Sequence, residues 1–173
     1  MTAYGAPQLA NSFRTVRNNT IQIAEEIPED KYNFVPAPGT QSVGALLKHI
    51  AFGPKFYQDI HKAGITTFKD YNFPAAFAPI RAEEEKPRSK AEIVALLKSE
   101  GEKFASWLDS LTPEFLAQTF TDHMGQNPMS RLTSLHSPKE HEMHHRGQLM
   151  LIQRMLGIVP HLTRAREARQ AAN

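Results

Sequence analysis

Residues 141–160 read HEMHHRGQLMLIQRMLGIVP, and this stretch decides the predicted fold. Folded as a helix, it places His141 and His145 about 40° apart around the axis and one turn apart along it. The same face continues with one glutamine and four apolar residues: Gln148, Leu149, Ile152, Met155 and Leu156. This spacing predicts an amphipathic helix whose histidine pair points into the protein. Gly157 predicts the end of the helix, and Pro160 lies just beyond it.

Apolar residues at helical spacing also occur upstream, and polar capping residues precede two of these segments. The four helices are expected over residues 8–27, 43–62, 90–110 and 129–157. Pro54 and Pro138 each remove a backbone donor, which predicts a kink or a break at both positions. Residues 63–88 show no period and are expected to form a long irregular connection. Four amphipathic helices with almost no strand-like alternation predict an all-α four-helix bundle.

The length of 173 residues fits one domain, expected over residues 1–160, followed by a loose basic tail over 161–173. Apolar residues make up 40% of the chain and charged residues 22%, as in globular proteins. The formal net charge is only +2 and no long basic stripe is present, so no nucleic-acid partner is expected.

No apolar run approaches the roughly 18 residues that span a bilayer, and the first residues lack the pattern of a signal peptide. No membrane partner is therefore expected. The chain contains no cysteine, which excludes disulfides, thiolate metal ligands and a cysteine nucleophile. This absence fits the reducing cytoplasm, which is the expected location.

Buried imidazoles need partners for their ring nitrogens. The inward pair of His141 and His145 fits either two core histidines bonded to neighbours or two metal ligands. His49 lies on an inward face of the second helix, which it shares with Gly53. Two histidines from one helix and one from another would form a three-nitrogen site with open coordination positions, as a catalytic metal requires. Gly53 either leaves room beside this site or relieves the kink at Pro54.

The same stretch also satisfies H-E-x-x-H, the zinc-peptidase pattern in which Glu142 would be the general base. The extended metzincin pattern fails, because Gly147 stands one position too early and no histidine follows at the required place. Glu167, in the tail, is the only acidic residue after Glu142. An exposed ion pair of Glu142 with Arg146, four residues along the helix, would explain both charges without catalysis.

Two segments carry a resemblance to a known family: SVGALLKHIA at 42–51 and HEMHHRGQLMLIQRMLGIVP at 141–160. With the Pro-rich NFVPAPGTQSVG at 33–44 before the first histidine, the chain resembles the DinB/YfiT-like superfamily up to residue 160. The resemblance implies a four-helix bundle that holds a divalent metal through His49, His141 and His145. Zinc or nickel is expected first, with iron or manganese as alternatives.

Members of that family with known activity are often thiol transferases or isomerases that use low-molecular-weight thiols such as bacillithiol or mycothiol, and many form homodimers. The resemblance therefore implies a metal-dependent transferase or hydrolase, a small-molecule substrate such as a low-molecular-weight thiol, and a homodimeric state. Candidate general bases are His144, Glu142 and Tyr57. Two alternatives stay open, a non-catalytic metal-binding bundle linked to stress and a zinc peptidase of the H-E-x-x-H type.

Overall fold

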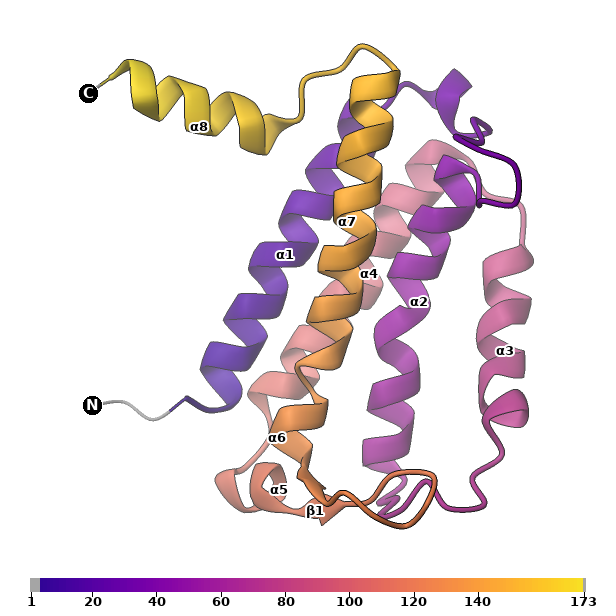
Figure 1. Ribbon diagram of the computed structural model, residues 1–173, viewed down its shortest axis with the longest axis vertical. Helices are drawn as coiled ribbons and strands as arrows, with labels where there is room; N and C mark the ends of the chain where they lie inside the picture. The colour runs from indigo at the N-terminus through magenta and orange to yellow at the C-terminus, as the bar shows by residue number, and fades with distance from the viewer. Residues whose placement is uncertain (1–3, 173) are drawn as a thin grey trace.

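Four long helices form the bundle: α1 (Ala6–Glu26), α2 (Val43–Lys62), α4 (Lys90–Asp109) and α7 (Ser137–Met155). The computed structural model in Figure 1 describes residues 4–172. Both α1 and α2 pack against α4 and α7, so the apolar stripes of the four helices meet in a shared core. The all-α four-helix bundle predicted from the sequence is confirmed.

Capping residues define where these helices begin. The Ser42 hydroxyl accepts a hydrogen bond from the Ala45 amide, and Ser89 forms a capping box with Glu92 at the start of α4. The expected fourth helix is divided into α6 (Arg131–Ser134) and α7, with Pro138 in the first turn of α7. The new helix begins there because proline fits the first turn, where its missing amide hydrogen has no helical partner.

The expectation of an irregular connection over 63–88 is wrong. Residues Phe73–Glu85 form α3, which runs beside α2 at the edge of the bundle (Figure 1). Asn72 caps its first turn through a hydrogen bond from the Ala75 amide. Phe77 stacks on Phe56 of α2 with 4.5 Å between ring centroids. This helix forms because its apolar side gains a partner on α2, a contact between segments distant in the sequence.

The loose tail is also a helix, α8 (His161–Ala171), and only Asn173 of the tail lies outside the described residues. His161 is buried, and Arg164 forms an ion pair with Glu26 of α1. The remaining short elements are η1 (Glu29–Lys31), α5 (Pro113–Ala117), β1 (Thr119–Phe120) and β2 (Met129–Ser130), and the two strands pair antiparallel. Within residues 4–172, no helix is both long and apolar enough to cross a bilayer.

One buried arginine links all four long helices. Arg17 of α1 donates hydrogen bonds to the backbone carbonyls of Leu97 in α4 and Ile50 in α2, and it forms an ion pair with Glu142 of α7. The Ile50 carbonyl is the one that would accept a helical hydrogen bond from residue 54, and Pro54 has no amide hydrogen to give. Arg17 therefore supplies the donor that proline removes, and α2 continues through Pro54 as one helix.

Candidate metal centre

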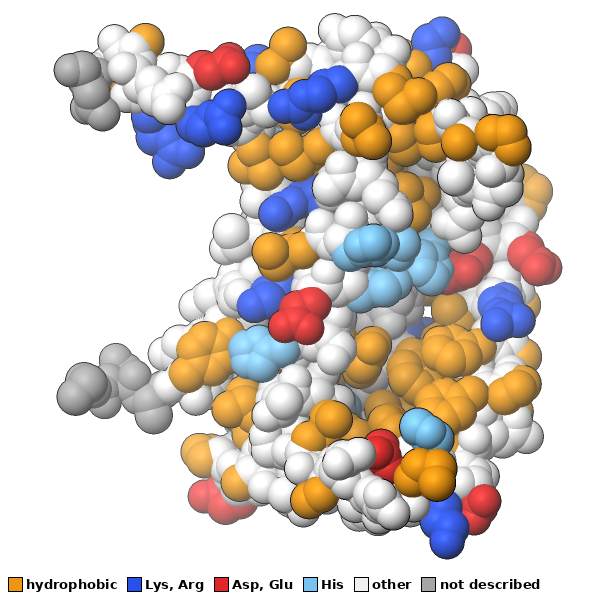
Figure 2. Space-filling view, viewed as in Figure 1, with side chains coloured by type: hydrophobic (Ala, Val, Ile, Leu, Met, Phe, Trp, Pro, Cys, Tyr) orange, Lys and Arg blue, Asp and Glu red, His pale blue; other side chains and the backbone are white. Residues whose placement is uncertain are grey.

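Three histidine nitrogens converge half-way along the bundle. The Nε2 atom of His141 lies 3.0 Å from Nε2 of His49 and 3.0 Å from Nε2 of His145. One nitrogen from each of these three residues lies within 4.8 Å of the other two. The structure thus brings together the three residues that the sequence singled out, one from α2 and two from α7. Figure 2 shows histidine side chains gathered on this face of the molecule beside hydrophobic ones.

Hydrogen bonds on the far side of two rings fix their orientation. Nδ1 of His49 lies 3.0 Å from Oε1 of Glu84 on α3, and Nδ1 of His145 lies 2.8 Å from Oε1 of Gln148. Both oxygens are acceptors, so each Nδ1 carries the proton and each Nε2 presents a lone pair to the centre. Partners of this kind are typical of metal-ligating histidines, in which they set the tautomer and the direction of the ring.

The chemistry of this donor set fits a divalent cation. With the protons of His49 and His145 on Nδ1, the Nε2 lone pairs of both rings face Nε2 of His141 at 3.0 Å, and one divalent cation can be held by three nitrogens placed in this way. Burial, followed by the neighbouring imidazoles, lowers the pKa of His141 to about 4. Burial also lowers the pKa of His145. Both rings are therefore neutral near pH 7, the protonation state that a metal ligand needs.

Gly53 creates the space that His141 occupies. A Cβ atom at position 53 would lie 3.1 Å from Nδ1 and 3.2 Å from Cε1 of His141, closer than ordinary van der Waals contact. The sequence left two explanations for this glycine, space beside the histidines or relief of the kink at Pro54. The short distances to His141 favour the first explanation. The kink at Pro54 is instead compensated by Arg17.

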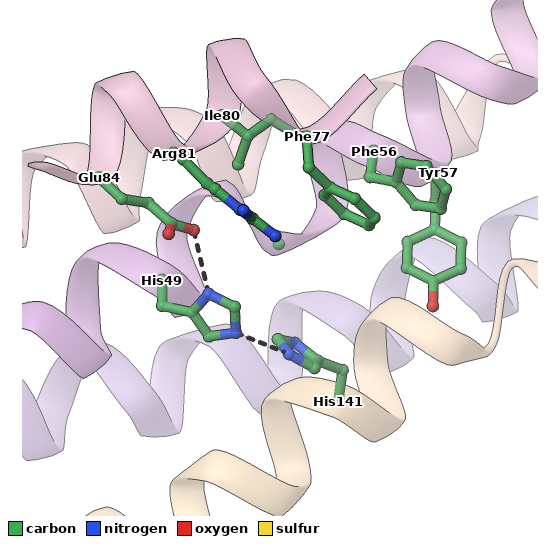
Figure 3. A pocket seen from close by; sticks show the side chains of 9 residues that line it. His49, Phe56, Tyr57, Phe77, Ile80, Arg81, Glu84 and His141 are labelled. Atoms are coloured by element: carbon green, nitrogen blue, oxygen red, sulfur yellow. Dashed lines mark hydrogen bonds and ion pairs between the residues drawn. The ribbon is translucent and has the colours of Figure 1, made fainter. Parts of the chain in front are cut away.

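Two cavities reach the histidines from different sides. The first, which we call the α3 cavity, has a volume of about 300 Å³ and is lined by His49, Gly53, Phe56, Tyr57, Phe77, Ile80, Arg81, Glu84 and His141 (Figure 3). The second, the loop cavity, has about 500 Å³ and is lined by Pro36, Ala37, Thr40, Gln41, Leu46, His49, His145, Gln148, Leu151, Ile152 and Met155. His49 borders both, so each cavity gives access to the histidine cluster.

Comparison with known proteins now identifies the family. The profile of the DinB superfamily matches residues 12–149. The chain belongs to the DinB superfamily. The match covers α2, α3, α4 and most of α7, and so includes all three histidines. The resemblance inferred from the two sequence segments is confirmed.

Relatives from Bacillus show the same DinB fold. YjoA of Bacillus subtilis, an uncharacterized protein, is 28% identical over 152 residues, which are 87% of this chain and 90% of YjoA. The crystal structure of YjoA matches with a TM-score of 0.65 and 27% identity over 87% of this chain and 92% of that chain. A DinB-like protein from Bacillus cereus matches with a TM-score of 0.67 and 19% identity over 88% and 93% of the two chains.

YfiT from Bacillus subtilis is described as a probable metal-dependent hydrolase with an unusual four-helix bundle topology. It matches with a TM-score of 0.67 and 14% identity over 91% of each chain. At 19% and 14% identity, the Bacillus cereus protein and YfiT show that the fold is shared and nothing more.

The expected ion pair of Glu142 with Arg146 is wrong. Glu142 is 1% exposed and pairs with Arg17, which is 3% exposed, at 3.0 Å. It lies on the side of α7 that faces α1, and it lines neither cavity beside the histidines. In this DinB protein Glu142 is therefore a buried structural partner, and the H-E-x-x-H reading lacks its general base.

The other two candidate bases lie near the cluster but are poorly suited to that role. Burial raises the pKa of Tyr57, which lines the α3 cavity, so its hydroxyl stays protonated and acts as a hydrogen-bond donor. His144 is exposed, and its Nε2 accepts a hydrogen bond of 3.2 Å from the Gln148 amide. No candidate general base from the sequence is placed against the three Nε2 atoms.

The remaining histidines lie away from the cluster. His61 is buried and accepts a hydrogen bond of 2.7 Å from Arg131 at Nδ1, while its Nε2 donates to the Ser134 hydroxyl. Burial, followed by the charge of Arg131, lowers the pKa of His61 to about 4. His161 lies 3.2 Å from the Asn19 side chain, near α8. These contacts give both residues structural roles.

Sequence reasoning missed Glu84 and did not recognise the role of Gln148. Glu84 falls in the segment that was expected to be irregular, so no face could be assigned to it. Its signal was the spacing of Phe73, Phe77 and Ile80, which continues to position 84 at intervals of four, three and four. On a helix this spacing places Glu84 on the apolar face that packs on α2.

Proposed function

We propose that this protein is a divalent-metal-dependent enzyme in which His49, His141 and His145 hold the ion. One observation carries the proposal: three imidazoles turn their Nε2 atoms toward one point, while Glu84 and Gln148 occupy the other nitrogens of two of them. Glu84 comes from a different helix than the ligands, so α3 contributes to the orientation of the site.

A divalent ion held by three neutral ligands keeps its full charge and supplies a Lewis acid that lowers the pKa of a bound water or thiol. Zinc or nickel suits nitrogen ligands best, and iron or manganese are alternatives. Glu84 holds the proton of His49 on Nδ1, which keeps Nε2 free as a ligand. Tyr57 contributes its aromatic ring to the wall of the α3 cavity, and its hydroxyl interacts with Ser137 at the start of α7.

The reaction that we propose is transfer involving a low-molecular-weight thiol, such as bacillithiol or mycothiol, and a small electrophile. Two cavities that both reach His49 support a reaction with two substrates, one from each side. The chain has no cysteine of its own, so a sulfur nucleophile has to come from a cosubstrate. The open cavities also favour catalysis over a purely structural metal, which proteins usually enclose.

Hydrolysis is the second candidate, because water could take the place of the thiol and because YfiT, which shares the fold, is described as a probable metal-dependent hydrolase.

We further propose a homodimer in the cytoplasm. The exposed apolar side chains of Leu151, Met155 and Val159 support a surface that a second copy covers.

The test combines metal analysis with an activity screen. Purified protein should contain one divalent ion per chain, and alanine at His49, His141 or His145 should remove most of it. Alanine at exposed His123 should leave the metal content unchanged. The wild type should conjugate an electrophile such as monochlorobimane with one of several thiols faster than the metal-free protein does. A full metal content in His49→Ala would contradict the proposed metal site. Hydrolysis of nitrophenyl esters without any thiol conjugation would contradict the proposed thiol reaction.

A further inference from the structure

Arg81 has no role in the proposed metal chemistry, yet it lines the α3 cavity. It lies on α3, three residues before Glu84, so the two side chains share one side of the helix. Glu84 is the residue that binds Nδ1 of His49. Figure 3 shows its side chain reaching into the cavity between Glu84 and Phe77. A guanidinium group therefore stands at the wall of the space next to the histidine cluster.

The acidic neighbours of Arg81 on α3 do not neutralise it. Glu84 is engaged with His49, and Glu83 forms ion pairs with Lys86 and Arg88. Within residues 4–172, Arg81 itself forms no ion pair and no side-chain hydrogen bond. A guanidinium has five N–H donors arranged as a fork that matches a carboxylate, so this group is available to a ligand.

The rest of the α3 cavity is mostly apolar. Phe56 and Phe77 stack against each other, and Ile80 is buried between α3 and the bundle. A cavity of about 300 Å³ with such walls suits a compact aromatic or branched body. The carboxylate of Glu84 borders the same space, which disfavours a dianion such as phosphate, and no second cationic side chain lines the cavity to offset it.

We propose that Arg81 is a specificity-determining residue that binds the carboxylate of a small apolar or aromatic acid in the α3 cavity. The acid would then be one of the two substrates of the enzyme, and in this respect the inference rests on the proposed function. Recognition of the carboxylate by Arg81 needs only the cavity and the guanidinium. It can therefore be measured with the metal-free protein as well as with the loaded one.

The experiment is calorimetric titration with three probes, phenylacetate, the neutral phenylacetamide of the same shape, and phenyl phosphate. In metal-free wild type, phenylacetate should bind about tenfold more tightly than phenylacetamide, because a charge-assisted hydrogen-bonded pair forms with Arg81. Arg81→Gln should remove that difference, and Arg81→Lys should keep part of it, since lysine retains the charge without the fork. Arg166→Gln, an exposed arginine on α8, is the control for net charge and should bind as the wild type does.

Equal phenylacetate affinities in wild type and Arg81→Gln, or no measurable phenylacetate binding, would overturn the inference. Tighter binding of phenyl phosphate than of phenylacetate would overturn the choice of a carboxylate. The zinc-loaded proteins are titrated in parallel, because a carboxylate could also bind zinc, an attraction that Arg81→Gln would leave in place. A wild type that takes up no metal would contradict the proposed function, but the metal-free comparison would still decide the role of Arg81.

Discussion

Replacing Gly53 by alanine tests whether the space beside His141 matters for metal binding. The new methyl group would lie 3.1 Å from Nδ1 and 3.2 Å from Cε1 of the His141 ring. Carbon and nitrogen atoms in contact normally lie about 3.5 Å apart or more. The ring therefore has to move by a few tenths of an ångström, away from α2 and from its present position beside the Nε2 atoms of His49 and His145.

The size of the effect follows from the tolerance of metal bonds. Ligand distances hold to within about 0.2 Å, so a shift of a few tenths weakens one of three protein ligands without removing it. Changes next to a ligand typically cost about 10- to 100-fold in metal affinity. We expect the lower end, about tenfold or 1.4 kcal/mol, because only the position of the ring is altered. The metal-free protein should lose little stability, since alanine gains about 0.5–1 kcal/mol over glycine in a helix.

The assay is competition for zinc with a chromophoric chelator, combined with thermal unfolding of the metal-free proteins. Gly147→Ala is the matched control, because Gly147 also lies within a long helix and a Cβ atom there meets nothing within 4 Å. The control should bind zinc as the wild type does. Unchanged zinc affinity in Gly53→Ala would refute the reasoning, and so would an equal loss in both variants.

Three further substitutions test single contacts of Glu142, Glu84 and His61. Glu142→Gln should lower the free energy of unfolding by about 3 kcal/mol in denaturant titrations, because it leaves the charge of Arg17 buried without a counter-charge, while the folded variant should retain its metal. Glu84→Gln should reduce zinc affinity about tenfold or more in the chelator assay, whereas the melting of the metal-free protein should change little, because the carboxylate that orients His49 is lost. Burial keeps the pKa of His61 at about 4, below the value of about 6.5 in the unfolded chain, so the unfolded state alone takes up a proton as pH falls between these values. Relative to His61→Gln, the wild type should therefore lose stability from about pH 6.5 to 4, by at most about 1.4 kcal/mol per pH unit, and a parallel pH dependence of the two proteins would contradict this.

The fold and the three histidines could be predicted because both depend on periodicity within single helices. The stripe of α7 carries the histidine pair on its inward face, and His49 occupies an equivalent inward position on α2. Helix α3 could not be predicted in the same way. Pro74 in its first turn and Pro79 in its interior mask the period, and its stability comes from packing of Phe77 and Ile80 on α2. Glu84 was missed together with the helix that carries it.

Glu142 shows a different limit. The helical wheel correctly places it about 100° from His141, away from the direction in which the histidines point. A wheel describes one helix and does not say how many neighbours surround it. Because α7 packs against α1 as well as α2, the direction that looked like solvent is a second buried face. Arg17 lies opposite on α1, and nothing near Glu142 in the sequence indicates it.

The buried pair on that second face has a direct bearing on the candidate metal centre, because it holds the residues next to two of the three histidines. Glu142 follows His141 in α7, and Ile50 follows His49 in α2. Arg17 binds the carboxylate of the first and the carbonyl of the second, and the carbonyl is free to accept because Pro54 has no amide hydrogen. One guanidinium thus joins a side chain of α7 to the backbone of α2 at the level of the histidines. The glutamate of the H-E-x-x-H pattern therefore helps to hold α7 in place beside the three histidines, and it lines neither of the two cavities.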